Sequence, residues 1–422
     1  MNVTISASVG GSSCADEQGK AEQARSYRQA QRRESRKALL LAAPLLLFLL
    51  ITFITPIGIL LMRSVQNPEL PGALPNLTRA LQQWDEAGTP GTDTYAVLAH
   101  ELVQASDKDE LGAVARRLNF YNPQMRSLLL KTARHLNNKD SQDWRATLLG
   151  IDARWGDQET WRLLKRAAHS PTPDYLLSAV DSKVDSSGDV VSLPVEESVY
   201  LTAFSRTVWI SASVTLICLL LAYPVAWLLA NLPARQSNRL MLLVIVPFWT
   251  SLLVRTTAWY VLLQPNGVVN NLLSGLGLVS QPLHLMFNRT GVLIGMTHIM
   301  LPFMILAIYS VMKGIPPVYL RAAQSLGARP LSAFVRIYVP QTLAGVGAGC
   351  FLVFVLSLGY YITPALLGGA GDEMISQLIS VQTNQQLNWG LAGALSAYLV
   401  IFTGIFYFIF NRLVGIDRLR FG

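Results

Sequence analysis

The stretch YLRAAQSLGARPLSAFVRIYVP, residues 319–340, is a short basic segment between two long apolar stretches. It carries three arginines and no acid, with a glycine near its middle and a proline at its end. A helix this short is marginal in water, so it must pack against something. It either packs on the apolar segments of its own chain or inserts into a cleft of another protein.

The residues around Gly327 predict two short helices joined by a sharp turn. VYLRAAQSL, 318–326, predicts about two helical turns, in which Ala322 and Ala323 give a small, smooth face. Gly327 suits a left-handed helix end, where a side chain would be unfavourable. Pro330 stops the first helix from continuing, and a second helix follows it.

Six apolar segments surround this stretch, in a chain of 422 residues that is 51% hydrophobic and 14% charged. Soluble domains carry roughly a quarter charged residues, so most of this chain is solvated by lipid. Each segment has about the 20 residues with which a helix crosses a bilayer, and backbone groups in lipid must be satisfied internally. We therefore expect an all-α integral membrane protein with six transmembrane helices, near 39–61, 202–230, 240–263, 291–312, 343–367 and 391–411.

The order of polar and apolar segments divides the chain into regions. A basic tail at 1–38, expected to be disordered, precedes the first span at 39–61. A mainly helical domain at 62–200 is inserted between the first and second spans, outside the membrane, and it is long enough to bury its own core. The other five helices form a core at 201–413 with a loop at 313–342, and a short tail occupies 414–422.

Basic residues are concentrated in the loops on one side of the predicted membrane. The tail before the first span, the loops after the second and fourth spans and the C-terminal tail all carry them, whereas 264–290 holds one arginine and 368–390 holds two acids and no base. The positive-inside rule therefore places both termini and residues 319–340 in the cytoplasm. Topology explains the net charge of +8, and no aromatic-basic stripe supports a nucleic-acid partner.

The basic stretch resembles a motif of the permease subunits of binding-protein-dependent ABC importers. That family carries a cytoplasmic loop of the form E-A-A-x3-G-x9-I-x-L-P between two spans. This chain matches the motif at Ala322, Ala323, Gly327, Ile337 and Pro340, with every spacing preserved. It departs from the motif at Arg321, which stands in place of the glutamate, and at Val339, which replaces the leucine.

The resemblance extends along the membrane core. Residues 246–273, 291–316 and 356–382 look like segments of spermidine/putrescine-type permeases, and the match covers the first span and roughly 200–413 but not the inserted block. It implies a multi-pass permease subunit of an ATP-driven importer in a bacterial inner membrane. The implied solute is a polyamine or a related small amino-cation, while phosphonate, an amino-acid-derived amine or another small solute stays open.

The resemblance also implies partners. The residues that would dock on a dimer of cytoplasmic ATPase subunits are Arg321, Ala322, Ala323, Gly327, Ile337 and Pro340. A second permease subunit, expected to differ from this one, would complete the pore within the lipid. A periplasmic solute-binding protein would deliver the solute.

Chemistry-bearing motifs are absent from the sequence. No G-x4-G-K-[ST] loop occurs, so we expect no nucleotide on this chain; ATP and Mg would be used by the partner ATPase. AHELVQA, 99–105, lacks the second histidine of a metalloprotease helix, and the three cysteines indicate neither a disulfide nor a metal site. The sequence predicts a transporter subunit rather than an enzyme.

Polar and aromatic residues inside the spans are candidates for the translocation path. They are Trp249, Arg255, Trp259, Tyr260, Tyr360 and Tyr361. Aromatic faces can bind an ammonium group through cation–π contacts. An arginine near the membrane centre costs roughly 2.5–3.5 kcal/mol on insertion scales. Arg255 therefore either faces the path or bonds to neighbouring carbonyls or a partner subunit, and a cationic solute favours the second interpretation.

Two acids and two further function classes complete the sequence-based hypotheses. Asp372 and Glu373 either attract cations or contact a binding protein at the outer side, or belong to a solvated glycine-rich loop.

A membrane sensor with 62–200 as its ligand domain would need a sizeable output domain, and the predicted tails are short. An ion-coupled carrier would need inverted repeats or buried ionisable groups, of which the spans offer little beyond Arg255.

Overall fold

The computed structural model describes residues 37, 40–136, 141–184, 189–194, 196 and 198–414. Apart from Lys37, the basic tail at 1–38 lies outside the described residues, as do residues 415–422. The described residues contain five helices that are long and apolar enough to cross a membrane, and a bent pair of helices brings the number to six. The prediction of an all-α membrane protein is confirmed.

The first span runs from Leu40 to Arg63, with a mean hydropathy of 2.7. It contains a π-helical stretch, η1 (Leu50–Ile54), followed by α2 (Thr55–Arg63). Residues up to Leu60 form a compact unit of their own, and the rest of the chain forms a second unit.

The inserted domain, residues 64–192, is mainly helical, as predicted. Its helices are α3 (Glu69–Ala73), α4 (Pro75–Gln83), α5 (Thr92–Asp107), α6 (Leu111–Tyr121), α7 (Pro123–Leu136), α8 (Trp144–Ile151), the 3-10 turn η2 (Ala153–Gly156), α9 (Gln158–Ala167) and α10 (Asp174–Ser178). A two-stranded antiparallel sheet follows, with β1 (Ser182–Val184) paired to β2 (Val190–Ser192) so that Lys183 faces Val191.

Three large aromatic side chains form the centre of the inserted domain. Tyr95, Trp155 and Trp161 are fully buried, and the ring centroids of Tyr95 and Trp161 are 4.7 Å apart. Their polar atoms are satisfied internally: Tyr95 Oη and Trp161 Nε1 each donate to the Trp155 carbonyl at 2.9 Å. Because the hydrogen-bond partners of these buried aromatic groups lie within the domain, its core forms independently of lipid.

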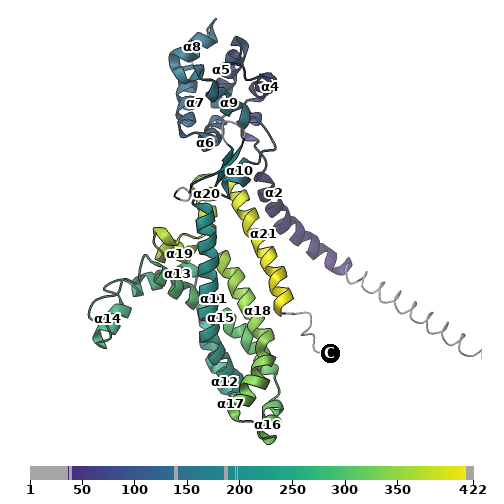
Figure 1. The fold of residues 1–422 in the computed structure, drawn as a ribbon, viewed down its shortest axis with the longest axis vertical. Helices are drawn as coiled ribbons and strands as arrows, with labels where there is room; N and C mark the ends of the chain where they lie inside the picture. The colour runs from purple at the N-terminus through teal and green to yellow at the C-terminus, as the bar shows by residue number, and fades with distance from the viewer. Residues whose placement is uncertain are drawn as a thin grey trace, which may run out of the picture. The chain divides into compact units, whose positions relative to one another are not determined.

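The membrane core is built around three long helices that pack together, α11 (Tyr200–Asn231), α15 (Arg289–Gly314) and α18 (Val339–Leu358) (Figure 1). Glycines allow the close approach of α18 to α15. A Cβ added at Gly345 would lie 2.9 Å from Val311 Cβ, and one at Gly349 would lie 2.7 Å from Met304 Sδ. The last span, α21 (Trp389–Val414), lies outside this group and contacts α18 and α20 (Ile375–Asn384).

The third span is not the continuous helix expected at 240–263. It consists of α12 (Ala234–Ile245) and the 3-10 turn η4 (Val246–Trp249), then α13 (Leu252–Leu262), with a 97° bend between the two parts. Two local signals explain the break. Pro247 begins the tight turn, and the Ser251 hydroxyl accepts a hydrogen bond from Val254 N at 3.2 Å, which caps a new helix. The short α14 (Val268–Gly275) follows.

The fifth span also differs from the expected 343–367. It begins earlier, because α17 (Pro330–Ala333) and the π-helical η5 (Phe334–Tyr338) run directly into α18. It ends at Leu358, and a break around Gly359 separates it from α19 (Ile362–Leu367). A 3-10 turn, η6 (Ala370–Asp372), then leads to α20.

Candidate coupling and translocation sites

The basic stretch forms the short helix α16 (Val318–Ser325) and a turn at Gly327, as the sequence predicts. Gly327 has φ +86°, and a Cβ added there would meet no atom within 4 Å. The backbone conformation, rather than crowding, therefore selects glycine at this position. In Figure 1, α16 lies at the extreme end of the membrane core, beyond α12 and α17.

The two alanines of α16 face different surroundings. Ala323 is 7% exposed and packs towards the chain, where α16 contacts η5. Ala322 is exposed, as is Arg321 before it. Ile337 is half-buried on η5, and Pro340 is exposed in the first turn of α18. The outward face of α16 thus consists of a small side chain and a base, while the inward face attaches the helix to its own chain.

Large apolar side chains flank this outward face. Leu326 is 88% exposed at the C-terminal end of α16, and Leu331 is 75% exposed at the start of α17. Arg329, between them, is exposed. Neither Arg321 nor Arg329 makes an ion pair with another described residue. Exposed leucines beside bases that form no ion pair with the described residues agree with the docking surface that the sequence predicts, which stays a prediction.

A polar cluster lies within the membrane core between α13, α15 and the break after α18. Arg255 Nε and Nη1 and His298 Nδ1 are buried without a hydrogen-bond partner among the described residues, and Tyr360 lies at the break after α18. The rings of Trp259 and His298 are 5.4 Å apart. Polar groups left unpaired in apolar surroundings are unfavourable, which favours a functional role for this cluster.

The sequence predicted part of this cluster. Trp259, one turn after Arg255 on α13, contacts His298, which sequence reasoning missed although a histidine inside an apolar span is itself a signal. Tyr360 lies at the break that follows α18 rather than inside a continuous span.

The other three predicted path residues are placed differently. Trp249 is 75% exposed and Tyr361 is 40% exposed, so neither is enclosed by this chain. Tyr260 lines a pocket of about 280 Å³ together with Phe287 and His284. The six predicted residues therefore do not form one continuous site within the described chain.

Asp372 is part of the fold rather than of a solvated loop. It is 7% exposed, and its Oδ1 accepts a hydrogen bond from Arg289 Nε at 3.1 Å. Arg289 begins α15, so this ion pair ties the loop before α20 to the start of α15. The Glu373 carbonyl accepts a hydrogen bond from Arg206 Nη1 at 3.1 Å. The solvated-loop interpretation is therefore wrong for Asp372, because α15 already supplies its cationic partner.

The inserted domain is attached to the membrane core at an apolar junction. Tyr175 on α10 packs with Leu391 and Leu395 of α21, and Ala203 of α11 completes the contact. A Cβ added at Gly390 would overlap the ring of Tyr175. The residue types on these elements gave no sequence signal for the junction, because the partners are far apart along the chain.

Asp181 reinforces the junction by capping α11. Its Oδ1 accepts from Tyr200 N at 3.1 Å, and its Oδ2 accepts from Leu201 N at 2.7 Å. Asp181 is 3% exposed. Because the first amides of a helix have no partner within the helix, this carboxylate fixes the position of α11 relative to the inserted domain.

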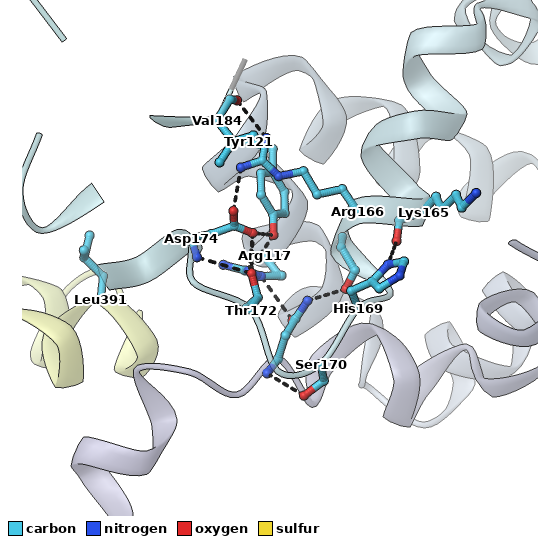
Figure 2. A network of polar contacts seen from close by, with 12 residues as sticks. Arg117, Tyr121, Lys165, Arg166, His169, Ser170, Thr172, Asp174, Val184 and Leu391 are labelled. Carbon is cyan, nitrogen blue, oxygen red and sulfur yellow. Dashed lines mark hydrogen bonds and ion pairs between the residues drawn. The ribbon is translucent and has the colours of Figure 1, made fainter. Parts of the chain in front are cut away.

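A buried polar network adjoins the junction (Figure 2). Asp174, at the start of α10, is the common acceptor: Tyr121 Oη and Thr172 Oγ1 each donate to its Oδ2 at 2.6 Å, and Arg166 Nη2 donates to its Oδ1 at 2.5 Å. Burial disfavours the charged carboxyl, but the hydrogen bonds from Arg166 and Thr172 outweigh it and hold the pKa of Asp174 below its usual range.

Arg117 completes the network from α6. Its Nη2 lies 3.6 Å from Asp174 Oδ2, and its side chain is 1% exposed. The guanidinium also lies over aromatic rings, 4.0 Å from the centroid of Tyr175 and 5.2 Å from that of Phe120. Burial raises the pKa of Tyr121, so its hydroxyl stays protonated and remains a donor to Asp174. The network joins α6, α9 and α10 directly behind the face that contacts α21.

The membrane core with its broken third span, and the short glycine-terminated helix between the fourth and fifth spans, define a permease of the importer class. A family model, "Binding-protein-dependent transport system inner membrane component", matches residues 203–416. The chain belongs to this family, and it is a permease component of an ABC importer.

Two similar proteins are named as permeases of spermidine/putrescine transport systems. The chain is 38% identical to the spermidine/putrescine transport system permease protein PotB of Escherichia coli (strain K12), over 47% of this chain and 72% of that protein. It is 31% identical to PotB of Haemophilus influenzae, over 57% of this chain and 87% of that protein. The crystal structure of a bacterial ABC transporter involved in alginate import matches with a TM-score of 0.44 and 18% identity, over 53% of this chain and 80% of that chain.

Proposed function

We propose that this permease imports polyamines or related small amino-cations, and that ATP hydrolysis by a separate subunit drives the transport. The observation that carries the coupling part is α16: its outward face is small and basic, it is flanked by exposed leucines, and its inward face is fixed to the core. The names of the PotB relatives support the choice of solute.

The proposed transporter contains four kinds of subunit. A cytoplasmic ATPase dimer holds ATP and Mg and receives α16, a second and different permease subunit completes the pore, and a periplasmic binding protein delivers the solute. The bases near α12 and α16 support the cytoplasmic location of that end of the core and of both termini in the bacterial inner membrane. The inserted domain is then periplasmic, where it either seats the binding protein or stabilises the outer ends of the spans.

The connectivity around α16 supports a mechanism of alternating access. The helix joins the end of α15 to α17, which runs into α18, and α15 and α18 pack closely through Gly345 and Gly349. A displacement of α16 by closure of the ATPase dimer therefore acts on two packed spans at once. These same spans carry His298 and adjoin Tyr360, so the polar cluster changes its surroundings when they move.

The solute would pass aromatic faces rather than acids. Over residues 201–371 the core contains no Asp or Glu, and Asp372 is already paired with Arg289. Trp249 and Tyr361 are exposed aromatic groups that a second subunit could enclose together with an ammonium. Arg255 repels a cation and has two buried nitrogens without a hydrogen-bond partner among the described residues, so its proposed partner is a group of the second permease subunit rather than the solute.

The experiment that tests the function is reconstitution of the complete transporter in proteoliposomes. The proposed ATPase, second permease and binding protein would be purified with it, and uptake of radiolabelled putrescine and spermidine would be followed with and without internal ATP. ATP-dependent uptake that unlabelled polyamine competes supports the proposal. Competition by a phosphonate or an amino acid but not by polyamines would replace the solute, and uptake without ATP would overturn the coupling.

A further inference from the structure

Arg321 occupies an unusual electrostatic position on α16. It lies one turn from the N-terminus of the helix, where the helix dipole favours an acid over a base. Its side chain is exposed, beside the exposed Ala322. Nothing in the local structure therefore stabilises a positive charge at this position.

The rest of the membrane core supplies no carboxylate to Arg321. Residues 201–371 contain no acid, and among the described core residues Asp372 and Glu373 lie at the opposite end, beside α20 and the start of α15. Other bases are close in sequence, Lys313 before α16 and Arg329 after it. Among the described core residues, the end that carries α16 therefore holds bases and no acid.

The surroundings of Arg321 indicate that another protein covers it. Ala322 offers room for close approach, and Leu326, on the same short helix, is 88% exposed. When such a surface docks in a cleft, the guanidinium loses its water, and an unpaired buried charge is strongly unfavourable. The cleft must therefore provide an anion next to Ala322.

We infer that the ATPase subunit that receives α16 carries an acidic side chain facing Arg321. The permease then supplies the base and the ATPase supplies the acid, which is the reverse of the arrangement expected where the motif begins with glutamate. This inference rests on the proposed function. It makes Arg321 a determinant of partner choice, because an ATPase without that acid leaves the guanidinium unpaired, and an ATPase with a base there repels it.

A lipid headgroup is the competing anion, and the position of α16 argues against it. The helix lies beyond the ends of α12 and α17, at the tip of the core (Figure 1). Arg235 is likewise exposed, near the start of α12, and is followed by the apolar half of that helix. Arg235 therefore provides a matched control for any effect of positive charge on topology or lipid binding.

The test uses the complete transporter in nanodiscs and measures ATP hydrolysis stimulated by the loaded binding protein, together with co-purification of the ATPase. We expect Arg321→Glu to lower stimulated hydrolysis about tenfold or more, Arg321→Gln to lower it less, and Arg235→Glu to leave it nearly unchanged. Each acid near the docking cleft of the ATPase would then be changed to arginine, and one of these changes should restore coupling to Arg321→Glu alone.

Three results would overturn the inference. Arg321→Glu could retain full coupling, no acid-to-arginine change could rescue it, or the defect could disappear in nanodiscs of purely zwitterionic lipid. Ala322→Trp separates these failures from failure of the proposed function. If Ala322→Trp abolishes coupling while Arg321→Glu does not, α16 docks on the ATPase without the acidic contact; if neither matters, the docking itself is wrong.

Discussion

The inserted domain and the membrane core satisfy the same physical demands in opposite ways. The inserted domain buries Tyr95, Trp155 and Trp161 completely and pairs its buried charges with one another around Asp174. The membrane core leaves Leu220 65% and Phe408 73% exposed, and it leaves Arg255 Nε and Nη1 buried without a hydrogen-bond partner among the described residues. The inserted domain buries its large aromatic groups within itself, whereas the core presents apolar side chains as expected for a surface in lipid.

This difference separates stability from function within one chain. Changes inside the inserted domain should act on folding, because its contacts are internal. Changes on the outward surfaces of the core should act on transport and leave folding intact, because those surfaces contact nothing in this chain.

The largest expected effect is on coupling, from Ala322→Trp. The indole would occupy the outward face of α16, where close approach of the ATPase is proposed, without touching the inward face. We expect solute-stimulated ATP hydrolysis to fall at least about tenfold, as for loss of a central contact in an interface. Ala322→Ser, which preserves size, is the control and should keep most of the activity. An active Ala322→Trp transporter would contradict the assignment of this face.

A large effect on stability is expected from Arg117→Ala. The change removes a buried cation from Asp174 and from the rings of Tyr175 and Phe120. Breaking a buried pair costs roughly 3–5 kcal/mol, and Arg166 remains to offset part of this. Hydrogen exchange of α6 and α10 in the full-length chain should accelerate, while α15 and α18 keep their protection. Equal acceleration in the membrane helices would show that the two regions do not fold independently.

The junction between the regions can be weakened with Gly390→Val. The added side chain would overlap the ring of Tyr175, so α10 must move away from α21. Overpacking of this kind costs typically 1–3 kcal/mol. Limited proteolysis should cut the residues between β2 and α11 faster in this variant, with Gly404→Val as the control because a Cβ at Gly404 meets no atom within 4 Å. Unchanged cleavage would mean that the domain is held by other contacts.

The smallest effect is a pH dependence confined to the inserted domain. The pKa of Asp174 is lower in the folded state than its ordinary value of about 3.9, so the stabilisation is present above that value and declines as the pH falls from about 5 towards the folded-state pKa. Urea unfolding of the full chain at pH 7 and pH 4, followed by exchange of α9 and α10, should show this loss. Asp174→Asn should be less stable at pH 7 and should flatten the profile.

A structural feature could be predicted from the sequence where its cause lies in one residue or in a short stretch of neighbouring residues. Gly327 was predictable because a left-handed backbone angle is a property of one residue. The break in the third span also has local signals, Pro247 and Ser251, but a continuous apolar run concealed them.

The remaining features depend on residues distant in the chain. Asp372 pairs with Arg289, which is 83 residues away, and Asp181 caps a helix that begins 19 residues later. Nothing near either acid indicates its partner. The same holds for His298, which contacts Trp259 on α13, 39 residues earlier in the chain.

The close packing of α15 against α18 has a mechanical consequence for the short helix between them. Gly345 and Gly349 let α18 pack in close contact with α15, so in the proposed mechanism a displacement of α16 acts on both spans together. A small rotation imposed at the tip would therefore reach the far end of the pair as a rigid tilt, with an amplitude that grows along the length of the helices. Alanine at either glycine would push α15 and α18 apart. It should reduce the movement transmitted from α16 before it affects binding of any subunit.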